Sequence, residues 1–402
     1  MRQAGKIPES HARQCLHIRV QLREARAAET WNSITGRSIM TERKGKIQTV
    51  SGLIDPFLLG ITLTHEHLAL KAESFLIPPA NNVQQQKMQM PFEMKNLGWI
   101  RQNPYSHLEN LSLQGEDEAI IEEMKEYKAL GGQAVVENTT TGLSRDVGFL
   151  KLVSDVSGVH IISGTGFYAE SFQSESVRQL SEEAMSEVMR QEITNGVENT
   201  DIKCGVIGEV GCSWPLTEFE KRSLRASAAV QVELGSPAII HPGRNSQAPF
   251  EIMRIFLEAG GQANRTVMSH LDRTIFNSDE LLEFAKFGCY CEYDLFGIET
   301  SHYQLQQEKD MPNDANRIAF IRFLVEGGYG DRVVVAHDLH TKHRLKKYGG
   351  HGYTHILENV VPKMRQRGFN NDTINKILCD NPRTWLTFHC IICFSVLQLK
   401  DK

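Results

Sequence analysis

The alternation of short apolar runs with helical segments is the feature that most limits the fold of this chain. Eight apolar runs occur, at residues 59–65, 134–138, 159–164, 204–210, 237–241, 265–270, 289–294 and 332–338. Each is apolar over nearly its whole length, which is typical of strands that are covered on both faces in a parallel sheet.

Segments with the apolar spacing of helices separate most of these runs. The clearest are residues 117–132, 180–193, 217–235, 248–261 and 316–328. Strict alternation of strands and helices predicts an α/β fold, specifically a closed (β/α)₈ TIM barrel over residues 45–388. An open doubly wound sheet is the alternative. That fold usually has a Gly-rich phosphate loop after its first strand, whereas the first run here ends in THEHL.

Composition excludes several classes of protein. The 402 residues include 44 Lys+Arg and 49 Asp+Glu, a formal net charge of -5 that argues against nucleic acid or a membrane surface as partner. The mean hydropathy is -0.33, and no apolar run approaches the roughly 20 residues that cross a bilayer. We therefore expect neither a nucleic acid nor a membrane as partner, and the sequence leaves open whether the chain forms a homodimer.

The two ends of the chain differ from its middle. Residues 1–40 carry seven basic and three acidic residues without sustained periodicity. We expect a flexible N-terminal extension at 1–44 and an appended C-terminal tail at 389–402. The absence of an apolar signal core favours the cytoplasm, and an Arg-rich mitochondrial transit peptide is the alternative.

Residue types that can bind metals lie at the ends of the expected strands. Barrels of this type have their active sites there. They are His65, Glu66, His67, Glu209, His241, His270, His337 and Asp338. Residues i and i+2 of a strand face the same side, so His65 and His67 can bind one ion while Glu66 points into packing. The set suffices for two divalent ions that share a carboxylate and a water. Zinc is expected, although manganese and cobalt accept the same ligands.

Five stretches carry a resemblance to a known family: VENTTTGLSRDV (136–147), IKCGVIGEVGCSWPLT (202–217), IIHPGRN (239–245), SHLDRTIF (269–276) and AHDLHTKHRLKKYGGHGYTHI (336–356). They resemble the phosphotriesterase family of the amidohydrolase superfamily, over roughly Gly45 to Phe388. The resemblance implies that His65, His67 and Asp338 hold the more buried metal. It also implies that His241 and His270 hold the more exposed one. Glu209 then bridges the two, where the bacterial phosphotriesterases have a carboxylated lysine.

The resemblance also implies an activity. Two ions turn a bridging water into hydroxide, and Asp338 carries its proton to the leaving amine as the catalytic residue. The implied substrates are N-acyl taurines, chiefly N-acetyltaurine, which would give taurine and acetate, with N-acetyl amino acids as related substrates. The alternatives are a lactonase or phosphotriesterase-type hydrolase, and a metal-binding barrel without catalysis.

Basic residues follow the expected ligands in loops on the active-site face, where a sulfonate or carboxylate needs a fixed cation. They are Arg244, Arg273, Lys342, His343 and Arg344, and Arg244 is the first choice for binding the substrate anion. Any one of them could instead be a solvated loop charge or pair with an acid such as Asp272. Tyr293, Phe167 and Tyr168 end other strands and are candidates either for lining the acyl pocket or for packing in the core.

Overall fold

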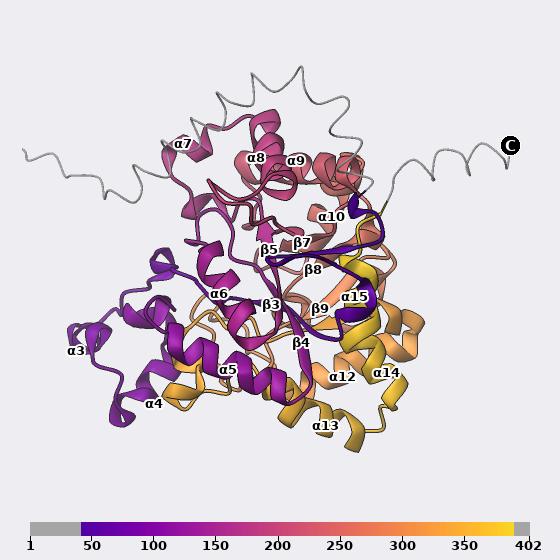
Figure 1. Ribbon diagram of the computed structural model, residues 1–402. Coiled ribbons are helices and arrows are strands. Elements are labelled where there is room, and N and C mark those ends of the chain that lie inside the picture. Colours follow the sequence, from indigo (N-terminus) through magenta and orange to yellow (C-terminus); the bar gives the residue numbers. More distant parts are fainter. Residues whose placement is uncertain (1–41, 390–402) are drawn as a thin grey trace, which may run out of the picture.

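The computed structural model describes residues 42–389, and its strands form a barrel surrounded by helices (Figure 1). Eight strands make up one sheet in chain order: β3 (Ile61–Glu66), β4 (Gly132–Glu137), β5 (His160–Thr165), β6 (Val206–Gly211), β7 (Ala238–His241), β8 (Thr266–Met268), β9 (Tyr290–Tyr293) and β10 (Val333–Val335). Each pairs in parallel with the next. The predicted TIM barrel is confirmed.

The first and last strands of the sheet close the ring. Thr64 Oγ1 donates to Val335 O at 3.2 Å, and Asp338 N donates to His65 O at 3.0 Å. The second contact joins two of the residues expected to bind metal. Barrel closure therefore fixes the spacing of these ligands at the C-terminal end of the strands.

Helices cover the outside of the barrel. The main ones are α5 (Asp117–Ala129), α6 (Val147–Ser157), α8 (Glu182–Thr194), α9 (Glu218–Leu234), α10 (Ala248–Glu258), α11 (Ser278–Ala285), α12 (Asp314–Leu324), α13 (Val361–Gln366), α14 (Asn371–Asn375) and α15 (Asn381–Leu386). Helix α9 begins with a full capping box, in which Thr217 and Glu220 satisfy each other's backbone N–H groups. Helices α6 and α11 were not among the helices expected from apolar spacing.

The N-terminal end of the barrel is closed by apolar packing. Trp385 of α15 is fully buried and donates from Nε1 to Ala238 O, at the start of β7, at 3.1 Å. An antiparallel hairpin that the sequence did not predict, β1 (Ile47–Thr49) and β2 (Gly52–Ile54), adds Ile47 to the same cluster. The opposite, C-terminal end is left for the functional site.

A long excursion between β3 and α5 reaches the C-terminal end of the barrel. It contains the short helices η2 (Glu73–Phe75), α3 (Asn82–Gln85), η3 (Gln86–Gln89), α4 (Met94–Gln102), η4 (Pro104–Ser106) and η5 (Glu109–Leu111). In Figure 1 α3 and α4 lie to one side of the barrel, in indigo and purple. The excursion matters for function because it brings Phe75 and Tyr105 to the cavity described below.

The expected terminal segments lie mostly outside the described residues. Three residues of the expected 1–44 extension are described, and one of them, Arg43, is buried. Its Nη2 donates to Thr194 O at 3.2 Å, and its guanidinium lies 6.0 Å from the ring centroid of Phe388. Of the expected tail only His389 is described, and its N–H donates to Gly235 O. Within residues 42–389 there is no helix with the length and apolar character needed to span a membrane.

Candidate active site

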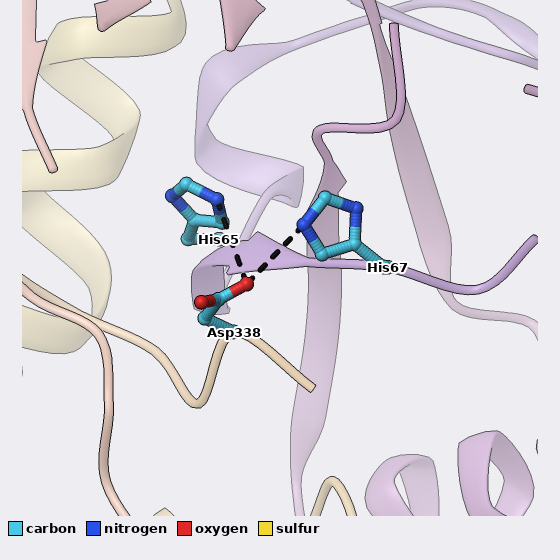
Figure 2. A group of neighbouring side chains, drawn as sticks. All are labelled: His65, His67 and Asp338. Carbon is cyan, nitrogen blue, oxygen red and sulfur yellow. Dashed lines mark ion pairs between the residues drawn. The ribbon is translucent and has the colours of Figure 1, made fainter. Parts of the chain in front are cut away.

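Three of the expected metal ligands converge at the point where the barrel closes (Figure 2). His65 lies near the end of β3, His67 just after it, and Asp338 beyond β10. Asp338 Oδ1 lies 3.2 Å from His67 Nε2 and 4.0 Å from His65 Nε2. All three side chains are buried, and Asp338 has a backbone φ of 49°, in the sparsely populated left-handed region.

Glu209 of β6 lies between this group and a second pair of histidines. Its Oε1 is 3.4 Å from His67 Nε2, and its Oε2 is 3.4 Å from His65 Nε2. The same Oε2 is 2.8 Å from His241 Nδ1 and 3.6 Å from His270 Nε2. One carboxylate thus contacts four imidazoles, which is the arrangement required of a bridging ligand.

His241 and His270 form the second half of the cluster. His241 is the last residue of β7, and His270 follows β8 by two residues. His270 Nε2 and His241 Nδ1 lie 2.8 Å apart. The structure therefore brings together all six side chains that are expected, from the sequence, to be metal ligands.

The chemistry of this donor set fits divalent metal ions. His65, Glu209 and His270 offer ligand atoms that lie within 4.8 Å of one another, as do His65, His67 and Asp338. Ligands held about 2.0–2.2 Å from one tetrahedral ion are separated by roughly 3–3.6 Å, close to the spacings above. In addition, His65 Nε2 is buried without a hydrogen-bond partner in the described chain, as expected for a nitrogen whose lone pair faces an ion.

A surrounding layer of hydrogen bonds fixes the orientation of the histidines. His65 Nδ1 lies 3.1 Å from Glu292 Oε2, and His67 Nδ1 lies 2.9 Å from Thr139 Oγ1. Thr139 in turn donates to Glu137 at 2.5 Å. Pairing Nδ1 in this way leaves Nε2 facing the cluster, which is the usual design of a histidine metal site.

Opposing electrostatic effects divide the four imidazoles into two pairs. Burial alone would lower the pKa of His65 and His67, but the surrounding carboxylates, Glu209 among them, outweigh it and raise both pKa values. Burial lowers the pKa of His241 to about 4 and holds that of His270 well below its usual value, and nearby Arg273 adds to both effects. His241 and His270 are therefore neutral at pH 7, the state in which imidazole binds a metal.

Two residues from the ends of the strands lie outside the cluster. Glu66 points away from it, as expected, and accepts hydrogen bonds from His337 Nδ1 at 2.7 Å and from His337 N at 2.8 Å. His337 Nε2 accepts from Ile356 N at 3.1 Å. Both ring nitrogens of His337 are thus occupied, so this histidine supports the loop after β10.

A small cavity, with about 30 Å³ of free space, lies over the cluster. His67, Glu209, His241, His270 and Asp338 line its floor, and its apolar walls include Leu70, Phe75, Leu143, Tyr168 and Leu295. A larger and more open cavity adjoins it, and the two share Tyr105, Ile298, Tyr303, Met311 and His340. The excursion after β3 supplies Phe75 and Tyr105, which could not be recognised in the sequence because no periodicity marks them.

The structure separates the expected substrate-binding cations. Arg244 and Arg273 line the cavity over the cluster. Lys342 does not, because it pairs with Glu109 at 3.1 Å and with Glu116 at 3.0 Å.

His343 and Arg344 line the adjoining cavity. The N–H and Nδ1 of His343 lie 2.9 and 3.0 Å from Asn110 Oδ1, while burial and Arg344 hold its pKa well below the usual value. His343 is therefore neutral at pH 7. Arg344 donates to the backbone carbonyls of His337 and Asp338.

Tyr293 does not line the cavity over the cluster, and of its two alternatives the structure shows core packing. It is buried on the helix side of β9, where its ring stacks on Phe320 of α12 at a centroid distance of 6.3 Å. Alternation along the strand explains this, because Glu292 and Asp294 on either side of it both face His65. Tyr168, by contrast, lines the cavity, and its hydroxyl lies 3.4 Å from both ring nitrogens of His241.

Known proteins share this fold and much of this sequence. Residues 45–386 match the family model described as "Phosphotriesterase family". The chain is 57% identical to "N-acetyltaurine hydrolase" of Rattus norvegicus and 56% identical to that of Homo sapiens. Each match covers 349 residues, 87% of this chain and 100% of the relative.

Two solved structures extend the comparison. A resiniferatoxin-binding protein from Rhodobacter sphaeroides is 30% identical, with a TM-score of 0.82 over 85% of this chain and 95% of its own. The phosphotriesterase homology protein from Escherichia coli, complexed with phosphate in its active site, is 26% identical, with a TM-score of 0.67 over 83% of this chain and 100% of its own. Taken with the metal-ligand cluster at the strand ends, these matches show that the chain is a hydrolase that belongs to the phosphotriesterase family.

Proposed function

We propose that this protein hydrolyses N-acetyltaurine to taurine and acetate, using two divalent metal ions, with zinc as the expected metal. The observation that carries the proposal is the identity of 56–57% with N-acetyltaurine hydrolases over their whole length. The cluster of four imidazoles and two carboxylates supports it, since such ligands bind divalent ions of this kind. We also propose that the enzyme works in the cytoplasm, which fractionation of cells that express it would test.

The residues divide between two ion positions. His65, His67 and Asp338 would hold the more buried ion, and His241 and His270 the other, with Glu209 shared between them. When bound, the two ions would activate a water molecule and polarise the acetyl carbonyl.

Asp338 is the residue that we assign to proton transfer. Burial would raise its pKa, yet the hydrogen bonds and charge of His340, together with His67, hold the pKa well below its usual value. Asp338 is therefore ionised at pH 7 and ready to accept a proton from the attacking water. Its side chain lines the cavity, so it can return that proton to the nitrogen of the leaving amine.

The walls of the cavity determine how the substrate lies. Leu70, Phe75 and Leu143 form an apolar surface next to the ligand cluster, which suits the methyl group of an acetyl chain. Phe75 is held by an aromatic contact with Phe172, at a centroid distance of 4.5 Å. These side chains also exclude water from the reacting amide.

A metal analysis followed by a substrate screen tests the proposal. We expect two ions per chain, loss of turnover on chelation, and recovery when zinc is restored. The screen compares N-acetyltaurine with a lactone and a phosphotriester under one set of conditions. Preferential cleavage of the lactone or the phosphotriester would contradict the proposal, and two bound ions without hydrolysis of any substrate would indicate a barrel without catalysis.

A further inference from the structure

Arg273, which is buried, and Arg244, which is half-buried, are cations that form no ion pair with an acid among the described residues. Arg244 follows β7 by three residues, and Arg273 ends the short helix η8 (Leu271–Arg273) after β8. Among residues 42–389, neither forms an ion pair with a carboxylate, although the charge of Asp272, which pairs with Arg317, interacts with that of Arg273. Both side chains line the cavity over the ligand cluster.

Several other buried cations of the chain are paired with acids or bonded to backbone carbonyls. Arg145, Arg317 and Lys342 each lie within 3.0 Å of an acid, at 2.7 Å, 2.9 Å and 3.0 Å respectively. Arg265 and Arg344 direct their terminal nitrogens at backbone carbonyls. Burying a charge without such compensation is unfavourable, so the buried guanidinium of Arg273 needs an explanation.

Arg273 is the more constrained of the pair. Its Nη2 lies 3.1 Å from His241 Nε2 and donates to Pro242 O at 3.2 Å, which fixes the plane of the guanidinium. The side chain is only 3% exposed, yet its Nη1 has no hydrogen-bond partner in the described chain. An unsatisfied charged donor of this kind points to a ligand that the protein itself does not supply.

Arg244 lies in a ring of neutral aromatic groups. Its Nε donates to Tyr303 Oη at 2.7 Å, and its guanidinium lies 5.5 Å from the centroid of the same ring. Tyr105 and Tyr168 line the same part of the cavity, and burial raises the pKa of both hydroxyls, so they are neutral at pH 7 and do not offset the charge. The described chain provides no hydrogen-bond partner for the two terminal nitrogens of Arg244, so they are available to an anion.

We propose that Arg244 and Arg273 together form the subsite that binds the sulfonate of the substrate. This inference rests on the proposed function, because it assigns one end of the proposed substrate. Only two methylene groups separate the amide nitrogen of N-acetyltaurine from its sulfur, so the anion must bind within the cavity that holds the reacting amide. The two arginines, on neighbouring loops beside His241, lie in that cavity.

The subsite also explains selectivity against uncharged amides. A neutral substrate would leave Nη1 of Arg273 and the terminal nitrogens of Arg244 without an anion to bind, and this penalty rejects an analogue more strongly than the loss of a surface contact would. Carboxylates of similar size would be accepted, but the three oxygens of a sulfonate match two guanidinium groups better.

Binding of a product-like anion tests the subsite without depending on turnover. Calorimetry on the metal-loaded protein compares propane-1-sulfonate with its uncharged analogue propane-1-sulfonamide, in the wild type, Arg244→Met, Arg273→Met and Arg244→Lys. The control is Arg254→Met, which changes an exposed arginine of α10 that pairs with Glu258. Metal content is measured for every variant, because Arg273 contacts His241.

The wild type and the control should bind the sulfonate about 10- to 100-fold more tightly than the sulfonamide, the usual size of a charge-assisted contact. Arg244→Met and Arg273→Met should each lose most of this preference, and Arg244→Lys should keep part of it. If Arg273→Met loses its metal, the two Arg244 variants decide the matter. Wild-type preference in Arg244→Met with its metals retained would overturn the subsite.

Hydrolysis assays separate this inference from the proposed function. Preferential binding of the sulfonate by a protein that does not cleave N-acetyltaurine would leave the subsite intact and contradict the proposed function. Cleavage of N-acetyltaurine and of neutral N-propylacetamide with equal kcat/KM would support hydrolysis and overturn the subsite.

Discussion

The carboxylate of Asp294 forms two hydrogen bonds with His270, one with the His270 ring and one with the His270 backbone N–H. His270 Nδ1 lies 2.8 Å from Asp294 Oδ1, and His270 N donates to Asp294 Oδ2 at 3.0 Å. His270 has a backbone φ of 55°, a conformation that non-glycine residues rarely adopt. The Asp294 carboxylate stabilises this backbone conformation of His270 and also directs His270 Nε2 toward Glu209.

Replacing Asp294 should weaken the metal site without unfolding the barrel. In Asp294→Asn, one oxygen becomes an amide donor that faces either the ring N–H or the backbone N–H. Losing such a supporting contact typically lowers metal affinity about 10- to 100-fold. Competition with a chelator measures the change, and Asp279→Asn on the surface of α11 is the control. Equal affinities in Asp294→Asn and the wild type would show that this carboxylate does not orient the ligand.

Replacing the ligands themselves should abolish hydrolysis while leaving the barrel folded, because the C-terminal ends of barrel strands serve function rather than stability. His65→Ala should lose metal, since its Nε2 faces both Glu209 and Asp338. Asp338→Asn should lower kcat severely even when it is loaded with metal, because an amide cannot accept the proton of the attacking water. Circular dichroism checks the fold. Turnover at the wild-type rate by metal-loaded Asp338→Asn would exclude its proposed role in proton transfer.

The sequence predicted the fold and the positions of the ligand residues because both depend on strand periodicity. Eight apolar runs place eight strand ends on one rim, so any histidine or carboxylate there falls near the others. The supporting roles of Glu137, Glu292 and Asp294 were not predicted, because these acids lie within apolar runs and were read only as strand residues. Strict alternation could have revealed Glu292 and Asp294, and it would have placed Tyr293 on the opposite face.

Contacts between distant parts of the chain could not be predicted from a single sequence. Lys342 follows Asp338 closely, which suggested a role at the site, but its partners Glu109 and Glu116 come from the excursion after β3. The same excursion provides Phe75 and Tyr105 to the cavity from a stretch without periodicity. Such long-range pairing depends on how a loop folds back over the barrel, and the spacing of residues along the sequence does not predict it.

Tyr293→Phe should leave hydrolysis unchanged. The Tyr293 side chain faces the helix layer, and its hydroxyl is buried without a hydrogen-bond partner in the described chain. Removing an unsatisfied hydroxyl should therefore stabilise the protein by about 1 kcal/mol or have no effect. Urea unfolding and kcat/KM are measured together, with Tyr168→Phe as the matched control whose hydroxyl does face the cavity. A large fall in kcat/KM for Tyr293→Phe alone would show that Tyr293 does contribute to substrate binding.

His343 should make stability depend on pH. Burial and Arg344 hold its folded-state pKa well below the usual value of 6.5. As the pH falls below 6.5, the unfolded chain binds this proton first, so the stability that His343 contributes is present above the unfolded-state pKa and is lost toward the folded-state pKa.

Urea unfolding of the metal-loaded wild type and His343→Gln, from pH 7.5 down to 5, measures this contribution. The free energy of unfolding of the wild type should fall more steeply with decreasing pH, by at most about 1.4 kcal/mol per pH unit for one group. The other histidines contribute equally to both proteins and cancel in the comparison. Parallel curves would mean that His343 is protonated equally in both states.

The N-terminal boundary of the domain should lie just before Arg43. The N-acetyltaurine hydrolases match 349 of the 402 residues over their whole length, and the family match begins at residue 45. Deletion of residues 1–39 should therefore leave kcat/KM and the free energy of unfolding unchanged.

Adding Arg43→Ala to this deletion removes the hydrogen bond to Thr194 O and the contact with the Phe388 ring. The loss should cost about 1–3 kcal/mol of unfolding free energy at constant kcat/KM, because these contacts lie far from the ligand cluster. Reduced activity in the simple deletion would show that residues 1–39 contribute to the working enzyme, and an unchanged free energy in the double variant would place the boundary after Arg43.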